Sequence, residues 1–122
     1  MEQGAPPAPS LEELVASGLP MIIADSMGRV ADINAAFTRV YGWEATQLIG
    51  ESLGLILPEA HRMSHQLAFS RFKPPQASAI LGHPLRLATR CADGSDITSE
   101  HLIIAVPKAS DWQFAATLKP LS

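Results

Sequence analysis

The last third of the chain alternates apolar and polar residues with a period of two, and this pattern constrains the fold most. The alternation runs through residues 85–91 and 112–118, with a strand-like apolar stretch at 97–106 between them. Successive side chains of a β-strand point to opposite faces, so a period of two predicts half-buried strands. Turn residues at 92–95 separate the first two segments. Three consecutive antiparallel strands are therefore expected.

The first half of the chain predicts a second hairpin and several short helices. An apolar run at 21–24 and an alternating run at 29–33 flank turn-forming residues, which is a β-hairpin pattern. Asn34 is placed to cap a helix that ends at Tyr41, and another helical turn is expected over 44–48. Two strands, short helices and three strands make an α+β domain, with helices on one face of a five-stranded antiparallel sheet.

The N-terminal residues divide into a leader and a short amphipathic helix. Residues 1–9 hold three of the ten prolines and few bulky side chains, so we expect a flexible leader. Ser10 and Glu13 have the spacing of a capping box, which predicts a helix over residues 10–18. Residues 19–122 then make up the main domain.

A longer helix is expected over residues 59–72, which contain no proline or glycine and are followed by two prolines. At about 100° per residue, one face of this helix collects apolar side chains and two imidazoles. The residues on this face are His61, His65, Ala68, Phe69 and Phe72.

Composition excludes several classes of function. The 12 acidic residues outnumber the 9 Lys and Arg, and no basic tract occurs, so nucleic-acid binding is not expected. Cys91 is the single cysteine, which excludes an internal disulfide framework and fits a reducing, cytoplasmic location. The longest apolar runs fall short of the roughly 20 residues that a membrane-spanning helix needs. Without a nucleophile elbow or a phosphate-binding loop, the chain is not expected to be an enzyme.

The order of elements and six local motifs resemble the PAS family of sensory domains. These motifs are Asp25 with Gly28, Asn34, Tyr41-Gly42-Trp43, Leu48-Ile49-Gly50, Leu57-Pro58-Glu59 and Asp93-Gly94-Ser95. The resemblance implies a PAS fold over residues 19–122. It also implies a sensory, signal-input domain that holds a small ligand or cofactor in an internal pocket and signals to a partner or effector. The alternative is a ligand-free module for dimerisation or protein interaction, whose core is filled by its own side chains.

Residues 57–94 resemble the haem-binding PAS domains of rhizobial oxygen-sensing histidine kinases. The resemblance makes haem b the leading specific cofactor and His65 its iron ligand. Leu85 stands where those sensors carry a distal arginine, so their oxygen-gated switch is not expected. Cys91 lies outside the helix that carries the reactive cysteine of flavin PAS domains, so flavin-adduct chemistry is not expected either. The cofactor-binding residues that the resemblance implies are His65, Phe69, Phe72, Ile80, Leu85, His101, Ile103 and Ala116.

His101 departs from the family, which has an apolar, pocket-facing residue in this part of the second long strand. Its side chain is therefore expected on the pocket side of the sheet, opposite His65. Three roles are open: a sixth ligand to haem iron, a hydrogen bond to a polar ligand, or a hydrogen bond to a buried hydroxyl such as Thr89 or Ser99. The hydrogen-bonding roles are favoured, since a buried imidazole costs free energy unless it is paired.

The same resemblance implies protein partners. Many PAS domains dimerise through a helix that precedes the first strand, and here that helix carries Leu11, Leu14 and Val15. A homodimer through these three residues is therefore expected, together with an effector domain or signalling protein. Neither a nucleic-acid partner nor a membrane partner is expected.

Overall fold

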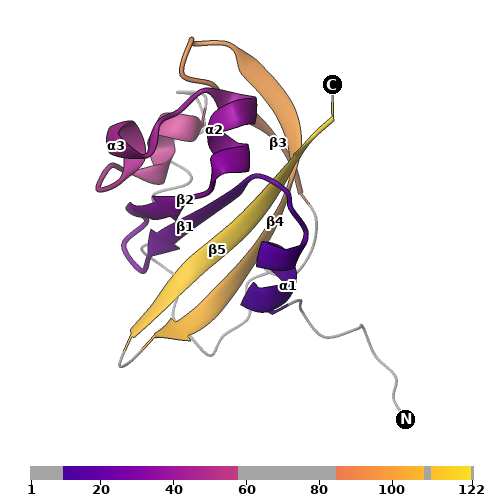
Figure 1. Ribbon diagram of the computed structural model, residues 1–122. Helices are drawn as coiled ribbons and strands as arrows, with labels where there is room; N and C mark the ends of the chain where they lie inside the picture. Colours follow the sequence, from indigo (N-terminus) through magenta and orange to yellow (C-terminus); the bar gives the residue numbers. More distant parts are fainter. Residues whose placement is uncertain (1–9, 58–84, 109–110, 122) are drawn as a thin grey trace.

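The computed structural model describes residues 10–57, 85–108 and 111–121 (Figure 1). Within these ranges five strands form one antiparallel sheet in the order β2-β1-β5-β4-β3. The strands are β1 (Met21–Asp25), β2 (Val30–Ile33), β3 (Leu85–Arg90), β4 (Asp96–Lys108) and β5 (Asp111–Pro120). The helices are α1 (Leu11–Ala16), α2 (Ala35–Tyr41), α3 (Ala45–Leu48) and the 3-10 helix η1 (Leu53–Ile56). The expected α+β class and five-stranded sheet are confirmed.

The N-terminal helix forms where its capping pattern predicts. Ser10 accepts a hydrogen bond from the Glu13 amide at 3.2 Å, and the Glu13 carboxylate accepts one from the Ser10 amide at 2.8 Å. Both halves of the capping box are thus present at the start of α1. The expected leader at 1–9 and the expected helix at 59–72 lie outside the described residues.

Asn34 connects α2 to the first strand of the sheet. Its Oδ1 accepts hydrogen bonds from the amides of Phe37 and Met21, each at 3.0 Å. Its Nδ2 donates to the Leu19 carbonyl at 3.0 Å. One side chain therefore caps the helix and also fixes the chain that enters β1.

Replacing Asn34 with alanine is expected to lower the free energy of unfolding by about 2 kcal/mol, because the helix cap and two further hydrogen bonds are lost. Asn34→Asp keeps the oxygen that accepts from Phe37 and Met21 and removes only the donor to Leu19. The free energy of unfolding of Asn34→Asp should fall by about half as much as that of the alanine variant, as measured by urea denaturation. Equal losses in the two variants would contradict this account of the cap.

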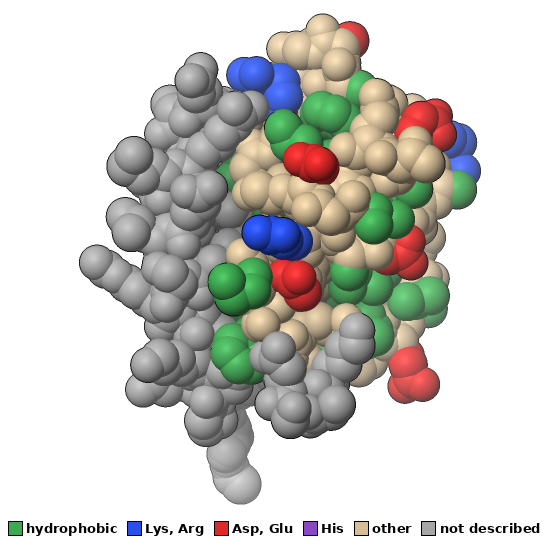
Figure 2. All heavy atoms as spheres, turned by 90° about the vertical axis from the view of Figure 1, so that its left-hand side faces the viewer, with side chains coloured by type: hydrophobic (Ala, Val, Ile, Leu, Met, Phe, Trp, Pro, Cys, Tyr) green, Lys and Arg blue, Asp and Glu red, His purple; other side chains and the backbone are tan. Residues whose placement is uncertain are grey.

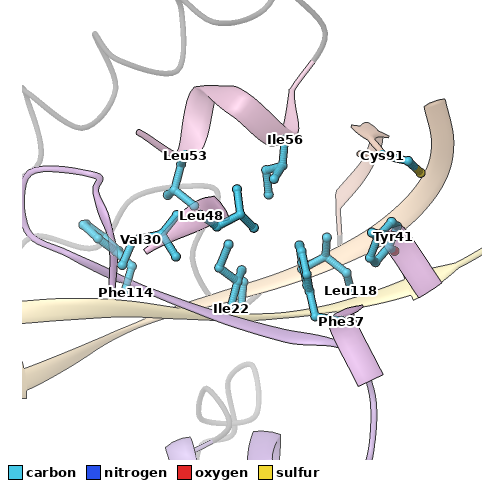
Figure 3. Close-up of a cluster of buried hydrophobic side chains, with 12 residues drawn as sticks. Ile22, Val30, Phe37, Tyr41, Leu48, Leu53, Ile56, Cys91, Phe114 and Leu118 are labelled. Atoms are coloured by element: carbon cyan, nitrogen blue, oxygen red, sulfur yellow. The ribbon is translucent and has the colours of Figure 1, made fainter. Parts of the chain in front are cut away.

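The two faces of the sheet have different coverings. Helices α2, α3 and η1 cover the inner face, where the main hydrophobic core lies (Figure 3). Their side chains meet strand residues such as Ile22, Phe114 and Leu118. Helix α1 covers part of the outer face, where Leu14 packs with Met21, Ile104 and Ala115 (Figure 1). Of the helices in the described ranges, none is long and apolar enough to cross a membrane.

Candidate functional site

Four of the eight predicted cofactor-binding residues lie within the described ranges, and the strand register brings them together. Leu85 on β3 is the Cα partner of His101 on β4, and Ile103 on β4 is the partner of Ala116 on β5. His101 and Ile103 are two residues apart on one strand, so both side chains point to the same face. The other four, His65, Phe69, Phe72 and Ile80, lie outside the described residues.

His101 belongs to a group of buried polar side chains on the inner face, which we call the inner-face polar network: Tyr41, Thr89, Ser99 and His101. His101 is 5% exposed, and its Nε2 lies 2.9 Å from the Thr89 hydroxyl. The hydroxyls of Tyr41 and Ser99 are 2.6 Å apart. His101 thus lies on the inner face, and of its three open roles the hydrogen bond with Thr89 is present. The expected position opposite His65 involves a residue outside the described ranges.

Local sequence explains how Tyr41 reaches the sheet. Phe37 and Tyr41 are four residues apart, so both lie on the helix face that packs on the core, with ring centroids 5.0 Å apart. Gly42 then ends α2 with a left-handed backbone, φ 84°. The Ala92 amide donates to the Tyr41 carbonyl at 3.0 Å, which connects the end of α2 to the β3–β4 turn.

Trp43 strengthens this connection. Its indole Nε1 donates to the Arg90 carbonyl at 2.8 Å. Arg90 also forms a 2.6 Å ion pair with Asp96 across the same turn. The Ala92–Tyr41 and Trp43–Arg90 hydrogen bonds thus connect the end of α2 to the β3–β4 turn, and the ion pair closes that turn.

Burial governs the electrostatics of the network. It raises the pKa of Tyr41 above the ordinary value of 10.0, while the hydrogen bonds from Ser99 and Thr89 act in the opposite sense. Among the described residues, the buried polar or charged side chains are Thr89, Ser99, His101 and Thr117. No group of three or more His, Cys, Asp or Glu side chains in the described ranges is arranged to hold a metal ion. The network therefore consists of three hydroxyls and one imidazole that hydrogen-bond one another.

Tyr41 is the chain's single tyrosine, so alkaline titration of tyrosinate absorbance reports this network directly. The pKa of Tyr41 is expected to lie above 10.0 in the folded chain and near 10.0 in the urea-unfolded chain. Because the unfolded state then loses its proton first, the folded state should lose stability as the pH rises above about 10. Ser99→Ala should raise the pKa further, since it removes a hydrogen bond that lowers it. A lower pKa in Ser99→Ala would contradict the arrangement.

Beside the network the inner face is apolar and partly accessible. Ile103 pairs with Ala116, and the next pair on the same face is Ala105 with Phe114. Ala116 is buried, while Ile103 and Ala105 are half-buried. Leu87, which is the partner of Ser99 on β3, remains 39% exposed. The sheet face is therefore exposed at Leu87 on its edge strand, whereas the network itself is buried.

The sequence pattern singled out Tyr41 only within a motif, although its spacing of four from Phe37 indicates that it faces the sheet. Cys91 is buried at 6% exposure and follows the last residue of β3. It lies there because the Cys91 amide and carbonyl close the β3–β4 turn against Ser95 and Gly94.

Comparisons with known proteins agree with this fold. Residues 13–79, more than half of the chain, match the family described as PAS fold. The sensor protein FixL of Bradyrhizobium diazoefficiens is 29% identical over 62 residues, which cover 51% of this chain and 12% of FixL. The chain thus spans only a small part of that relative.

Two solved structures show the same fold. The PAS domain of an HTR-like protein from Haloarcula marismortui has a TM-score of 0.70 and 17% identity, covering 91% of this chain and 94% of that one. The PAS domain of the quorum-sensing receptor RpfR from Cronobacter turicensis, in complex with BDSF, has a TM-score of 0.64 and 12% identity. That comparison covers 85% of this chain and 94% of the other.

Proposed function

Because this chain belongs to the PAS family of sensory domains, we propose that it binds a small ligand or cofactor against the inner face of its sheet and passes the bound state to a partner or effector. It acts by binding, not by catalysis, and it works in the cytoplasm. The position of His101 is the main support for this proposal. This imidazole is buried on the inner face, with a polar network on one side and the Ile103–Ala116 pair on the other.

The bound state reaches an effector through contacts that the polar network already makes. Thr89 and Ser99 belong to β3 and β4, and Ser99 meets Tyr41 at the end of α2. A ligand that contacts His101 therefore acts on β4 and, through the 2.9 Å contact with Thr89, on β3. Ser99, two residues before His101 on β4, connects that strand to α2 through the 2.6 Å contact with Tyr41. It shifts the population of their arrangements only to the extent that it binds one arrangement more tightly.

Haem is the leading specific candidate for this ligand, supported by the similarity to FixL and by the resemblance of residues 57–94. The apolar side chains of Ile103 and Ala116 fit one face of a porphyrin. The sheet residues fit iron ligation less well, because Nε2 of His101 is engaged by Thr89. In the haem form of the proposal the iron ligand is His65, with Phe69, Phe72 and Ile80 completing the site.

Native mass spectrometry of the freshly purified chain tests the ligand proposal. A stoichiometric adduct that disappears under denaturing conditions is the expected result, and an adduct-free chain would count against it. In a parallel sample, haemin is added and the excess removed by desalting. A Soret band that is absent from His65→Ala would identify haem, whereas an equal band in both proteins would reject His65 as the iron ligand.

The alternative function, a ligand-free interaction module, is favoured by one observation on α1. Val15, on the helix that was expected to form the dimer, is 61% exposed. Leu14 is 3% exposed because it packs on the outer face of its own sheet, and Leu11 is half-buried against the same cluster. A homodimer through α1 would therefore use Val15 and the remaining surface of Leu11. Sedimentation of the wild type and Val15→Glu distinguishes a dimer from a monomer.

A further inference from the structure

The sheet has two edge strands, and the described residues close only one of these edges. At the β2 edge, the Val30 amide donates to the Glu51 carbonyl and the Val30 carbonyl accepts from the Gly50 amide, each at 2.8 Å. At the other edge, β3 pairs with β4 and with no further strand of the described ranges. An edge strand with unpaired backbone groups is a template on which another chain can add a strand.

The register of the sheet shows which backbone groups of β3 point to the open side. The Leu121 amide donates to the Thr98 carbonyl at 2.9 Å, so the backbone groups of Thr98 point to the β5 side and away from β3. Ala88 is the Cα partner of Thr98 in an antiparallel pair. The amide and carbonyl of Ala88 therefore point away from β4, toward the open edge.

The end of β3 agrees with this direction. The Arg90 carbonyl accepts a hydrogen bond from the Trp43 indole at 2.8 Å, so it too points away from β4. Alternate residues of a strand share this direction, which adds Arg86 to the series. The open edge thus offers the amide and carbonyl groups of Arg86 and Ala88 to an added strand.

The side chains along this edge indicate which strand would fit it. On the outer face, Cα partners in neighbouring strands place Arg86, Glu100 and Lys119 in one row, in which the charges alternate in sign. An acidic residue beside Arg86 would continue the alternation, and opposite charges that face each other on adjacent strands are stabilising. On the inner face, Leu87 is 39% exposed and would pack against an apolar residue.

A second copy of β3 fits this edge less well. If two copies paired antiparallel about Leu87, the two Arg86 side chains would be diagonal neighbours on the outer face, about 7–8 Å apart. Residues 85–90 contain no acidic residue that could separate these like charges. The charges therefore favour a different chain as the partner.

We propose that β3 binds an extended segment of a partner protein as a sixth strand, and that this segment carries an acidic residue beside Arg86 and, next to it, an apolar residue beside Leu87. The inference rests on the proposed function and names the kind of partner that receives the signal. Thr89 lies on the same strand, with its hydroxyl 2.9 Å from Nε2 of His101. A shift of β3 on ligand binding would therefore reach the added strand.

Two capped nine-residue peptides of alternating threonine and valine test the charge preference, with the central threonine replaced by glutamate in one and by lysine in the other. Fluorescence anisotropy with the whole chain should give a dissociation constant for the glutamate peptide about fivefold below that of the lysine peptide. Arg86→Glu should invert this preference. Arg39→Glu makes the same charge change at an exposed position of α2 and should keep it. Equal affinities for the two peptides would overturn the proposal.

Hydrogen exchange of the backbone amides locates the added strand. The bound glutamate peptide should slow exchange at Arg86 and Ala88 and leave Leu87, whose amide faces β4, unchanged. Ala88→Pro removes an amide on the open side without removing a bond to β4, and it should weaken peptide binding about fivefold. A thermal unfolding curve shows whether this variant folds, and Arg86→Glu decides if it does not. Protection confined to other strands would overturn the proposal.

The outcomes separate this inference from the proposed function. Protection of Arg86 and Ala88 without any peptide, in a sample that sediments as a dimer, would assign the edge to a second copy and overturn the partner. If the glutamate peptide binds at β3 while native mass spectrometry and haemin addition find no ligand, the strand addition stands and the ligand-binding function is overturned. If a ligand is found and neither peptide binds, the function stands and this inference is overturned.

Discussion

Replacing Phe37 with alanine is expected to lower the free energy of unfolding by about 3–5 kcal/mol, the largest loss among the substitutions considered. Phe37 is 0% exposed and belongs to the inner-face core, where its side chain lies beside Leu118 (Figure 3). Its ring also packs against Tyr41, so the cavity would open beside the polar network. Urea denaturation measures the loss.

Ile49→Ala is the control, because Ile49 is 47% exposed. It should cost less than about 1 kcal/mol. Ile49 lies just after α3. Figure 2 shows one side of the molecule, on which hydrophobic side chains are scattered among acidic ones. A similar cost for the two substitutions would contradict the assignment of Phe37 to the core.

Leu118→Ala is expected to cost about 2–5 kcal/mol. Leu118 is 0% exposed on β5, a central strand of the sheet, and it is the Cα partner of His101. Removing its side chain should also lower the affinity for any inner-face ligand, because the apolar contact beside the imidazole is lost. Denaturation and titration of the same sample separate the two effects.

Leu121→Ala makes the same chemical change three residues further on, where Leu121 is 40% exposed. It should change the free energy of unfolding by less than about 1 kcal/mol and leave ligand binding unaltered. A large effect here and a small one at Leu118 would show that the register of β5 differs from the one described.

Local signals in the sequence predicted local structure well. The caps at Ser10 and Asn34 and the left-handed end of α2 at Gly42 each depend on a few neighbouring residues, and each is present. The order of strands was not predictable in this way, because β5 lies between β1 and β4 although the chain between β1 and β5 is long. The sequence predicts five antiparallel strands but not this order, which the structure shows.

The candidate site was predictable in part for the same reason. The family resemblance implied that His101 faces inward, and strand alternation puts Ser99 and Ile103 on the same face, because a period of two is a local property. The contact between Tyr41 and Ser99 joins residues 58 positions apart, so no local pattern reveals it. Leu14 illustrates a further limit. An apolar helix face shows that a residue is buried, but not whether its own sheet or a second molecule covers it.

The central claim, that a small molecule binds the inner face of the sheet, is tested most directly by neighbouring residues of β4. Ile103 packs with the inner-face core and Ile104 with the outer-face cluster, so their methyl groups report opposite faces. NMR spectra of isoleucine-methyl-labelled protein are recorded with haemin and, separately, with the molecule that native mass spectrometry finds on the purified chain. The account predicts that at least one probe shifts the Ile103 methyl signal and leaves Ile104 nearly unchanged. Shifts confined to Ile104, or none at Ile103 with either probe, would contradict it.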